Sequence, residues 1–310
     1  MLARGLFASY NPDEGRAIMT TSEPKPAGEQ APVKQDTSKA HEYNATVTQR
    51  TEVAPGLIIL RVVPDTLPFP FRAGQYLVLG LKVSEPRVSG ADDDPEGAGT
   101  VAAGGGLIRR AYSIASSSRG DEFLEFYLTL VRSGELSPRL FHLAVGDRLY
   151  VGPKAVGVFT LDRTPRDRHV LLAATGTGLA PYMSMLRTDL ACGGWRRFVI
   201  LQGARYSWDL GYRSELVALR RLCSNLTYIP VISRSSAEPA WRGRSGYLQD
   251  VLISSAIREE SGLYLTPETF HVYLCGNPAM IEVATARLIE RGFVKDKPGK
   301  IGTIHVEEYW

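Results

Sequence analysis

The pattern of hydrophobic residues changes near residue 163, and this change constrains the fold more than any other feature of the sequence. Before it, short alternating or β-branched runs such as "LIILRVV" and "EFLEFYLTLV" follow one another, with Pro and Gly between them. Such runs indicate an antiparallel barrel or sandwich. After it, strand-like runs alternate with helical patterns: "HVLLAA" precedes "YMSMLRTDLA", and "RFVILQGAR" precedes "SELVALRRLCS". This alternation predicts a doubly wound parallel sheet. We therefore expect an antiparallel β-barrel domain over residues 41–163 and an α/β domain over 164–310.

Two segments lie outside this pattern. Residues 1–40 are rich in Pro, Lys, Glu and Thr, and they have too few apolar side chains to offset the entropy of ordering, so we expect a disordered extension. Ser84–Gly106 is a polar, glycine-rich loop between two predicted strands. It is too long for a hairpin, so it either has a function or is an inert insertion. We favour the inert insertion.

Composition excludes some classes of protein. The 36 basic and 33 acidic side chains give a net charge of only +3, which argues against nucleic-acid binding through phosphate neutralisation and is compatible with an acidic protein partner. No apolar run approaches the roughly 18 residues that would span a bilayer. The three cysteines are odd in number and far apart, so we expect neither a disulfide framework nor a metal site. We expect a cytoplasmic protein from a reducing compartment.

The segment "AATGTGLAP" places a glycine turn after the first strand of the α/β domain. Gly176 and Gly178 would let the backbone approach a pyrophosphate, and Pro181 suits the first turn of the following helix; a purely structural turn remains an equal alternative.

Three arginines are expected at the same edge of the predicted sheet: Arg205 and Arg234 follow the second and third strands, and Arg244 lies in "WRGRSGY". Guanidinium groups match the geometry of a phosphate dianion, such as the 2′-phosphate of NADP. NAD would instead call for a carboxylate near the ribose, and no acid neighbours Ser233 or Arg234 in the sequence. The arginines favour NADP.

The segment "RRAYSIAS" combines cations with an aromatic residue in a predicted strand. Alternation places Arg110 and Tyr112 on one face and Ser113 on the other. Tyr112 could stack on a flat heterocycle whose phosphate Arg110 neutralises, or the two could be an ordinary strand aromatic and a surface charge. In "SGELSPRLFHL", Ser137 is expected at a helix N-cap with Pro138 in the first turn, which makes either a second anion site or a cap on the barrel.

Together these motifs resemble a known family. "AGQYLVLGL", "RAYS", "YLTLVRSGELSPRL", "TGTGLAPY", "ARYSWDLGY", "VISR", "CGNP" and "EEYW" occur in an order similar to that of the plant-type ferredoxin–NADP⁺ reductase superfamily, most closely its bacterial ferredoxin/flavodoxin–NADP⁺ reductases. The resemblance covers residues 41–310. It implies a barrel that binds FAD, an α/β domain that binds NADP(H), and an oxidoreductase that exchanges a hydride with NADP(H) and single electrons with ferredoxin or flavodoxin.

The resemblance also implies roles for residues in the barrel and at the end of the chain. Arg110 would meet the pyrophosphate, Tyr112 would stack on the isoalloxazine, and Ser113 would approach flavin N5. Tyr309 would cover the other face of the flavin, with Trp310 toward the adenine. The implied FAD residues are Arg110, Ala111, Tyr112, Ser113, Tyr127, Leu128, Thr129, Leu130, Glu135, Leu136, Ser137, Thr177, Tyr309 and Trp310.

For the nucleotide, the resemblance implies a site around the glycine turn and the three arginines. Its residues are Gly176, Thr177, Gly178, Arg205, Ser233, Arg234, Arg244, Cys275, Gly276 and Asn277. The implied catalytic residues are Ser113, Cys275, Tyr309 and, if "HVEEY" aligns without gaps, Glu307.

Other functions remain open from the sequence. Within enzymes, the alternative is a reductase that serves an oxygenase or free flavins; a fused iron–sulfur reductase is excluded because three cysteines cannot supply four cluster ligands. From another class, the barrel could bind nucleic acid while the α/β half senses a nucleotide. The interpretation that we favour predicts a monomer that contacts an acidic ferredoxin or flavodoxin transiently, and neither nucleic acid nor a membrane.

Overall fold

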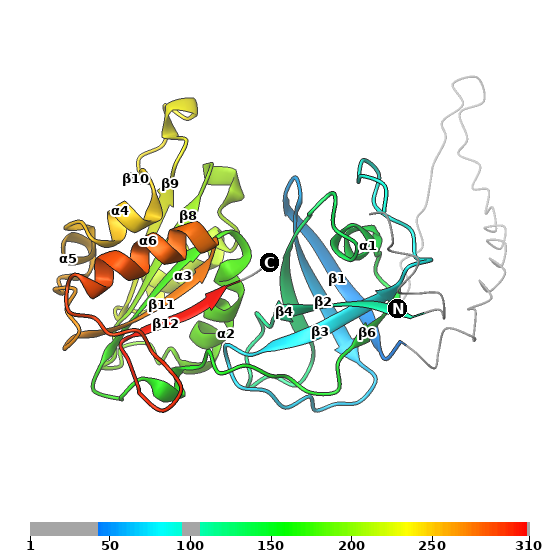
Figure 1. The fold of residues 1–310 in the computed structure, drawn as a ribbon, viewed down its shortest axis with the longest axis horizontal. Helices are drawn as coiled ribbons and strands as arrows, with labels where there is room; N and C mark the ends of the chain where they lie inside the picture. The colour runs from blue at the N-terminus through cyan, green and yellow to red at the C-terminus, as the bar shows by residue number, and fades with distance from the viewer. Residues whose placement is uncertain (1–42, 95–105, 309–310) are drawn as a thin grey trace, which may run out of the picture. The chain divides into compact units, whose positions relative to one another are not determined.

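The computed structural model describes residues 43–94 and 106–308, and the strands of these residues form two six-stranded sheets (Figure 1). The first sheet is antiparallel, with the order β4-β3-β6-β1-β2-β5. A short helix, α1, precedes its last strand. In chain order the elements are β1 (Ala45–Ala54), β2 (Leu57–Pro64), β3 (Tyr76–Lys82), β4 (Leu107–Ser113), β5 (Leu124–Thr129), α1 (Ser137–His142) and β6 (Arg148–Val151).

The first sheet curls into a barrel because its two outer strands meet. An isolated antiparallel bridge joins Ile114, just after β4, to Phe126 of β5. Alternate residues of β1, β2 and β3 are fully buried and fill the interior, for example Val47, Leu60 and Leu79. The alternation predicted from the sequence therefore follows the pleat of the strands.

The second sheet is parallel, with the order β10-β9-β8-β7-β11-β12. Its strands and helices alternate along the chain for most of its length, and a loop follows the last helix. The elements are β7 (His169–Thr175), α2 (Ala180–Asp189), β8 (Phe198–Ala204), α3 (Arg213–Leu222), β9 (Leu226–Ile232), β10 (Arg244–Ser245), α4 (Leu248–Leu252), α5 (Ala256–Ser261), β11 (Phe270–Gly276), α6 (Pro278–Ile289) and β12 (Ile304–Glu308).

Helices cover both faces of the parallel sheet (Figure 1). Leu171 and Ala173 of β7 pack in one core with residues of α4, α5 and α6, whereas Val170 and Leu172 pack on the opposite face with residues of α2 and α3. A strand buried on both faces has a continuous apolar sequence, as "HVLLAA" does. The predicted fold class is confirmed for the described residues; the domain boundary at residue 163 stays a prediction.

The apolar spacing of "GYLQDVLISSAI" is that of a single helix, but the structure divides it. The run contains α4 and the start of α5, which are separated by residues 253–255. The Ser254 hydroxyl donates to the Val251 carbonyl at 2.7 Å and accepts from the Ala256 N–H at 3.1 Å. A serine that bonds to nearby backbone competes with the helical hydrogen bonds, so the hydrophobic spacing alone overestimated the length of this helix.

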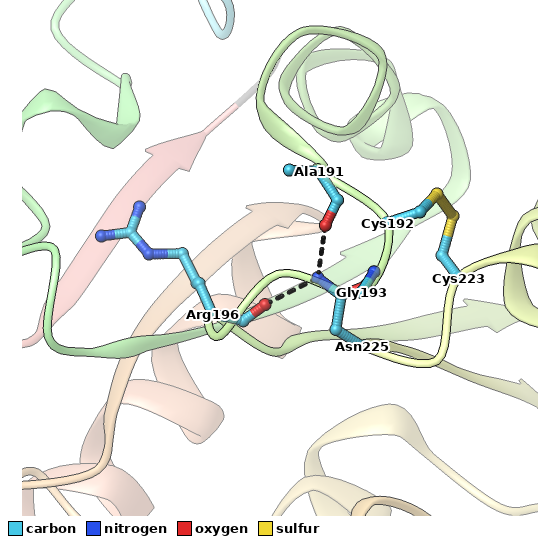
Figure 2. The surroundings of a disulfide bond; sticks show 6 residues. All are labelled: Ala191, Cys192, Gly193, Arg196, Cys223 and Asn225. Carbon is cyan, nitrogen blue, oxygen red and sulfur yellow. Dashed lines mark hydrogen bonds between the residues drawn. A yellow bond between two sulfur atoms is a disulfide. The ribbon is translucent and has the colours of Figure 1, made fainter.

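The prediction that the cysteines form no disulfide is wrong. Cys192 and Cys223 are joined, with Cα atoms 4.4 Å apart, and they connect the turn after α2 to the end of α3 (Figure 2). The Asn225 amide supports the same turn by donating 2.9 Å hydrogen bonds to the carbonyls of Ala191 and Arg196. The cysteines are 31 residues apart, but both lie where a helix returns to the next strand of the sheet, and such returns are neighbours in space.

Two further predictions concern the parts of the chain outside these ranges. The N-terminal forty residues and residues 95–105 of the predicted loop lie outside the described residues. Across residues 43–94 and 106–308, no helix combines the length and apolarity that crossing a membrane requires.

Candidate active site

A cavity of about 450 Å³, called here the barrel cavity, opens between β4, β5, the 131–136 loop and the start of α2. Every described residue of the predicted FAD set lines it except Leu130, which lines the neighbouring cavity. The lining residues are Arg110, Ala111, Tyr112, Ser113, Tyr127, Leu128, Thr129, Val131, Ser133, Gly134, Glu135, Leu136, Ser137, Thr177 and Ala180. Sequence reasoning missed Val131, Ser133, Gly134 and Ala180, although "RSG" is a turn signal that could have indicated part of this wall.

The β4 side of the barrel cavity carries charge and an aromatic ring. The Arg110 guanidinium pairs with the Glu135 carboxylate and donates to the Arg109 carbonyl at 2.8 Å. Burial raises the pKa of Tyr112 to about 12, against the opposing effect of Arg110, so the phenol stays neutral at physiological pH. The wall therefore offers a neutral ring beside a cation.

The Ser113 hydroxyl and the Glu307 carboxylate meet at the carboxyl end of β4. Ser113 is buried, and its Oγ donates to Oε2 of Glu307 at 3.3 Å. Glu307 belongs to β12 at the outer edge of the parallel sheet, so the fold joins residues 194 positions apart. The structure thus brings together two of the predicted catalytic residues. A third, Cys275, is buried in β11 beside Glu307, its register partner in β12, and the fourth, Tyr309, lies, with Trp310, outside the described residues.

The predicted N-cap role of Ser137 is wrong. Ser137 is the first residue of α1, and the N-cap position belongs to Leu136, which has no capping side chain. The Ser137 hydroxyl instead accepts from the Val131 N–H at 3.0 Å and donates to the Val131 carbonyl at 3.1 Å. It closes the 131–136 loop from inside, together with the Gly134 N–H, which donates to the same carbonyl at 2.9 Å.

Tyr127 has a mainly structural environment. It is 3% exposed, and its ring meets the Tyr212 ring edge-on, with centroids 5.2 Å apart. A Cβ on Gly211 would lie 2.1 Å from the Tyr127 hydroxyl, so this hydroxyl lies against the backbone that precedes α3. Only the remainder of the side chain is available to line the barrel cavity.

A second cavity of about 1150 Å³, called here the sheet cavity, lies at the carboxyl ends of the parallel strands. This is the edge where doubly wound sheets bind ligands. Of the predicted nucleotide residues, it is lined by Gly176, Thr177, Gly178, Arg205, Ser233, Gly276 and Asn277. Among residues that sequence reasoning missed are Asp209, Tyr247, Met280 and Val283. The two cavities share Thr129, Val131 and Thr177, so a ligand in one would be adjacent to a ligand in the other.

The glycines of this edge have different roles. Gly176 has a positive φ of 56°, and a Cβ there would meet no other described atom within 4 Å, so only its backbone conformation favours glycine. Gly178 is restricted by space, because a Cβ would lie 2.6 Å from the Cys275 carbonyl group. Gly276 combines a φ of 122° with a contact of 2.5 Å to the Thr175 carbonyl. The structural interpretation of the turn therefore holds for Gly178, whereas Gly176 is open toward the cavity.

The three arginines do not all line the sheet cavity. Arg205 lines it, with its side chain 67% exposed and Nε 3.4 Å from Asp209. Arg234 is adjacent, because its N–H donates to the Arg205 carbonyl at 3.0 Å. Arg244 instead pairs with Glu259 at 2.6 Å and Glu260 at 3.2 Å, both on α5. The backbones of Arg205 and Arg234 are thus adjacent, whereas the Arg244 side chain is held by acids; convergence of the guanidinium groups on a phosphate stays a prediction.

An aromatic pair missed by sequence reasoning lies beside these arginines. The rings of Tyr206 and Trp208 are stacked, with centroids 4.5 Å apart, and the Arg234 guanidinium donates to the Tyr206 hydroxyl at 3.1 Å. Trp208 is 53% exposed. The pair restricts where the Arg234 side chain can lie.

A buried carboxylate, Glu125 of β5, connects the barrel to α2 and α3. It is 1% exposed and accepts from Arg61 Nε at 2.6 Å, Arg187 Nη1 at 2.6 Å and the Tyr212 hydroxyl at 2.8 Å. Arg187 also pairs with Glu215 at 2.7 Å. Burial alone would raise the pKa of Glu125, but Arg187 and the other donors outweigh it and lower the pKa. This network fixes the first turn of α3 and the last turn of α2 against β5, which forms part of the wall of the barrel cavity.

The residues present fit a dinucleotide with a flat ring. Tyr112 supplies a ring face, Arg110 a cation, and Ser133 and Gly134 a tight polar turn, which are the group types that receive a heterocycle and its phosphates. No group of three or more His, Cys, Asp or Glu able to hold a metal ion is found among the described residues.

Comparisons with known proteins agree with this architecture. The oxidoreductase NAD-binding domain family matches residues 172–286. Ferredoxin–NADP reductase B of Sorangium cellulosum is 39% identical over 247 residues, 79% of this chain and 88% of that protein. Flavodoxin/ferredoxin–NADP reductase of Escherichia coli is 35% identical over 213 residues, 68% of this chain and 76% of that protein. A ferredoxin NADP⁺ reductase from Neisseria gonorrhoeae, solved with bound FAD and NADP, has the same fold, with a TM-score of 0.69 at 24% identity over 86% of this chain and 98% of that one.

A barrel joined to an NAD-binding α/β domain, with adjacent cavities, defines an oxidoreductase of the two-domain reductase class. The chain belongs to the flavodoxin/ferredoxin–NADP reductase family.

Proposed function

We propose that the chain binds FAD in the barrel cavity and NADP(H) in the sheet cavity, and that it exchanges a hydride with NADP(H) and single electrons with ferredoxin or flavodoxin. The observation that carries the proposal is the shared wall at Thr177, which would bring the two ligands into contact. Bound FAD would supply the conversion between two-electron and one-electron transfer, while the protein supplies binding and orientation.

In the barrel cavity, the geometry supports the proposed roles of four residues. Tyr112 offers a neutral ring for stacking, and Arg110, oriented by Glu135, neutralises a phosphate. The Ser113 hydroxyl and the Glu307 carboxylate lie together at the carboxyl end of β4. These two groups of the chain would orient the hydride transfer or hold a proton beside it. The rate of hydride transfer depends on the distance and angle between the reacting atoms, so a small displacement of either group would lower it.

In the sheet cavity, Arg205 and Arg234 would hold the 2′-phosphate of NADP(H), beside Ser233, which lines the cavity and whose N–H donates to the Ala204 carbonyl at 3.0 Å. Arg244 joins them only if its side chain leaves Glu259 and Glu260. Cys275, behind Gly178, would support the nicotinamide end. The roles of Tyr309 and Trp310 remain predictions from the family resemblance.

The proposed partner is an acidic ferredoxin or flavodoxin that binds transiently to a monomer of this chain. Nucleic acid and membranes are not proposed as partners. A cytoplasmic location is also proposed, and the Cys192–Cys223 disulfide is the observation that opposes it, because such bonds are rare in reducing compartments.

The test is an absorption spectrum of the purified chain followed by anaerobic titration with NADPH and, separately, NADH. We expect flavin bands that bleach at a much lower concentration of NADPH than of NADH. Arg234→Ala should weaken NADPH binding about 10- to 100-fold, since a charge-assisted hydrogen bond contributes about 1.5–3 kcal/mol, and should leave NADH nearly unaffected.

The matched control is Arg168→Ala, which removes an arginine that pairs with Asp167 before β7, at the opposite edge of the same sheet. It should change neither titration. Equal losses for NADPH and NADH in Arg234→Ala would contradict the phosphate site, and a chain that binds no FAD would contradict the proposed function as a whole.

A further inference from the structure

Arg139 in α1 is a buried cation. Its side chain is 2% exposed, and a buried guanidinium is stable only when hydrogen-bonded and paired with an opposite charge. Asp94 supplies that charge through two contacts, Nη1 to Oδ1 at 2.8 Å and Nη2 to Oδ2 at 2.6 Å. Arg139 also donates to the carbonyls of Val83 and Glu135, both at 2.6 Å. No other carboxylate contacts Arg139 within the described residues.

Asp94 belongs to the long loop for which the sequence favours an inert insertion, and the loop's first half, residues 84–94, is closely attached to the barrel. Asp94 also pairs with Arg87 at 2.6 Å, and Arg87 donates to the Arg132 carbonyl at 3.0 Å. The Asp92 N–H donates to the same carbonyl at 3.2 Å, and the Val88 N–H donates to the Pro138 carbonyl at 2.9 Å. These contacts argue against an inert role for this half.

The contacts reach the 131–136 loop from outside, at the carbonyls of Arg132 and Glu135. The opposite side of that loop lines the barrel cavity through Val131, Ser133, Gly134 and Glu135. Inside the loop, the Ser137 hydroxyl closes the turn by bonding both backbone groups of Val131. The loop is therefore held from two sides, and on the outer side the Asp94 carboxylate pairs with both arginines that bond to the loop carbonyls.

We propose that Asp94 is a positioning residue for the cofactor. Through Arg139 and Arg87 it holds the 131–136 loop in the conformation that contacts the phosphates of bound FAD. This inference rests on the proposed function, because it takes FAD to be the ligand of the barrel cavity. Asp94 lines neither of the two cavities, so it acts on the cofactor only through the loop.

The experiment measures FAD release from the full-length holoenzyme. Each protein is diluted into buffer without FAD, and release is followed by the rise of flavin fluorescence. We expect Asp94→Asn to release FAD about tenfold faster than the wild type, the low end of what the loss of a supporting contact costs at metal sites. With saturating FAD, its turnover should stay within about twofold of the wild type, since Asp94 touches no reacting group.

The matched control is Asp65→Asn. Asp65 pairs through both oxygens with Arg148 on the same barrel, and neither residue lines either of the two cavities. It should lower the melting temperature without changing FAD release. If Asp94→Asn lowers the melting temperature while FAD release stays at the wild-type rate, Asp94 is merely structural and the inference is overturned.

A second variant keeps the test decisive if Asp94→Asn does not fold. Arg87→Gln leaves Arg139 paired and removes only the link from Asp94 to the Arg132 carbonyl, so it should accelerate release by a smaller factor. Release at the wild-type rate in Arg87→Gln would then refute the inference. A wild-type chain that retains no FAD would refute the proposed function too, which distinguishes the two failures.

Discussion

Replacing Glu125 by Gln tests whether one buried carboxylate anchors the barrel to the α/β half. The substitution keeps the shape of the side chain and removes its charge. Removing one partner of a buried ion pair costs about 3–5 kcal/mol. Two observations reduce this value: Arg187 keeps Glu215, and Arg61 is 33% exposed and can be solvated. We therefore expect a loss of about 2–3 kcal/mol, or roughly 5–10 °C in melting temperature for a chain of this size.

The assay is thermal unfolding at pH 7 and at lower pH values, with saturating FAD in every sample. The folded-state pKa of Glu125 is lowered, so its stabilisation is complete above the unfolded pKa of about 4.5 and is lost as the pH falls through the folded value. The difference between wild type and Glu125→Gln should be constant above that pH and shrink below it.

The control for this experiment is Glu215→Gln, which removes the other carboxylate of the same arginine. Glu215 is 35% exposed, and exposed pairs contribute about 0–1 kcal/mol, so we expect a loss of at most a few degrees. A Glu125→Gln protein that is no less stable than Glu215→Gln at pH 7 would refute the argument that burial makes this carboxylate the anchor.

Three more predictions follow from the packing of the α/β half. Gly178→Ala should destabilise the chain by more than about 1 kcal/mol, the lower end for a strained core substitution, because its Cβ would meet the Cys275 carbonyl group; a melting curve checks this. Thiol titration in denaturant should find one reactive thiol without reductant and three with it, because Cys192 and Cys223 are joined; three without reductant would exclude the bond. Burial lowers the pKa of His305 to about 4, so this imidazole is protonated in the unfolded chain before it is protonated in the folded one. The free energy of unfolding should therefore fall as the pH is lowered from about 6.5 to 4. His305→Gln should flatten that part of the stability profile, and an unchanged slope would contradict the lowered pKa of His305.

The parts predictable from the sequence are those that depend on local patterns. Alternation along "LIILRVV" and the apolar run "HVLLAA" reflect side chains placed by strand geometry, and each run forms the expected strand. Part of the wall of the barrel cavity is predictable for a related reason, and the other predicted residues of the wall are those that the family resemblance implies. Arg110 to Ser113 are consecutive, so identifying the strand also identifies that part of the wall.

The parts that could not be predicted depend on long-range contacts. Glu125 stands in an alternating strand, where a charged residue is expected to face solvent. It is buried because residues 62 and 87 positions away pack on it. Arg244 of "WRGRSGY" is expected at the phosphate site, yet its side chain pairs with Glu259 and Glu260 of α5. The sequence shows the residue type at a strand end but not the acids that another helix brings there.

The same is true of Asp94. A polar, glycine-rich segment has no period from which a contact could be predicted, and its partner Arg139 resembles an ordinary surface arginine on a short helix. Only the folded chain shows that the arginine is buried and that the loop supplies its counter-charge.

The position of Glu125 also determines where this chain could be recombined with its relatives. A crossover near residue 163 would keep Glu125 and Arg61 but replace Arg187 and Tyr212 with whatever the donor carries. A chimera whose donor lacks an arginine at the position of Arg187 would inherit a buried carboxylate without its strongest counter-charge. A donor α/β domain for such a chimera should therefore first be required to carry the equivalents of Arg187 and Tyr212, and only then be chosen by overall sequence identity.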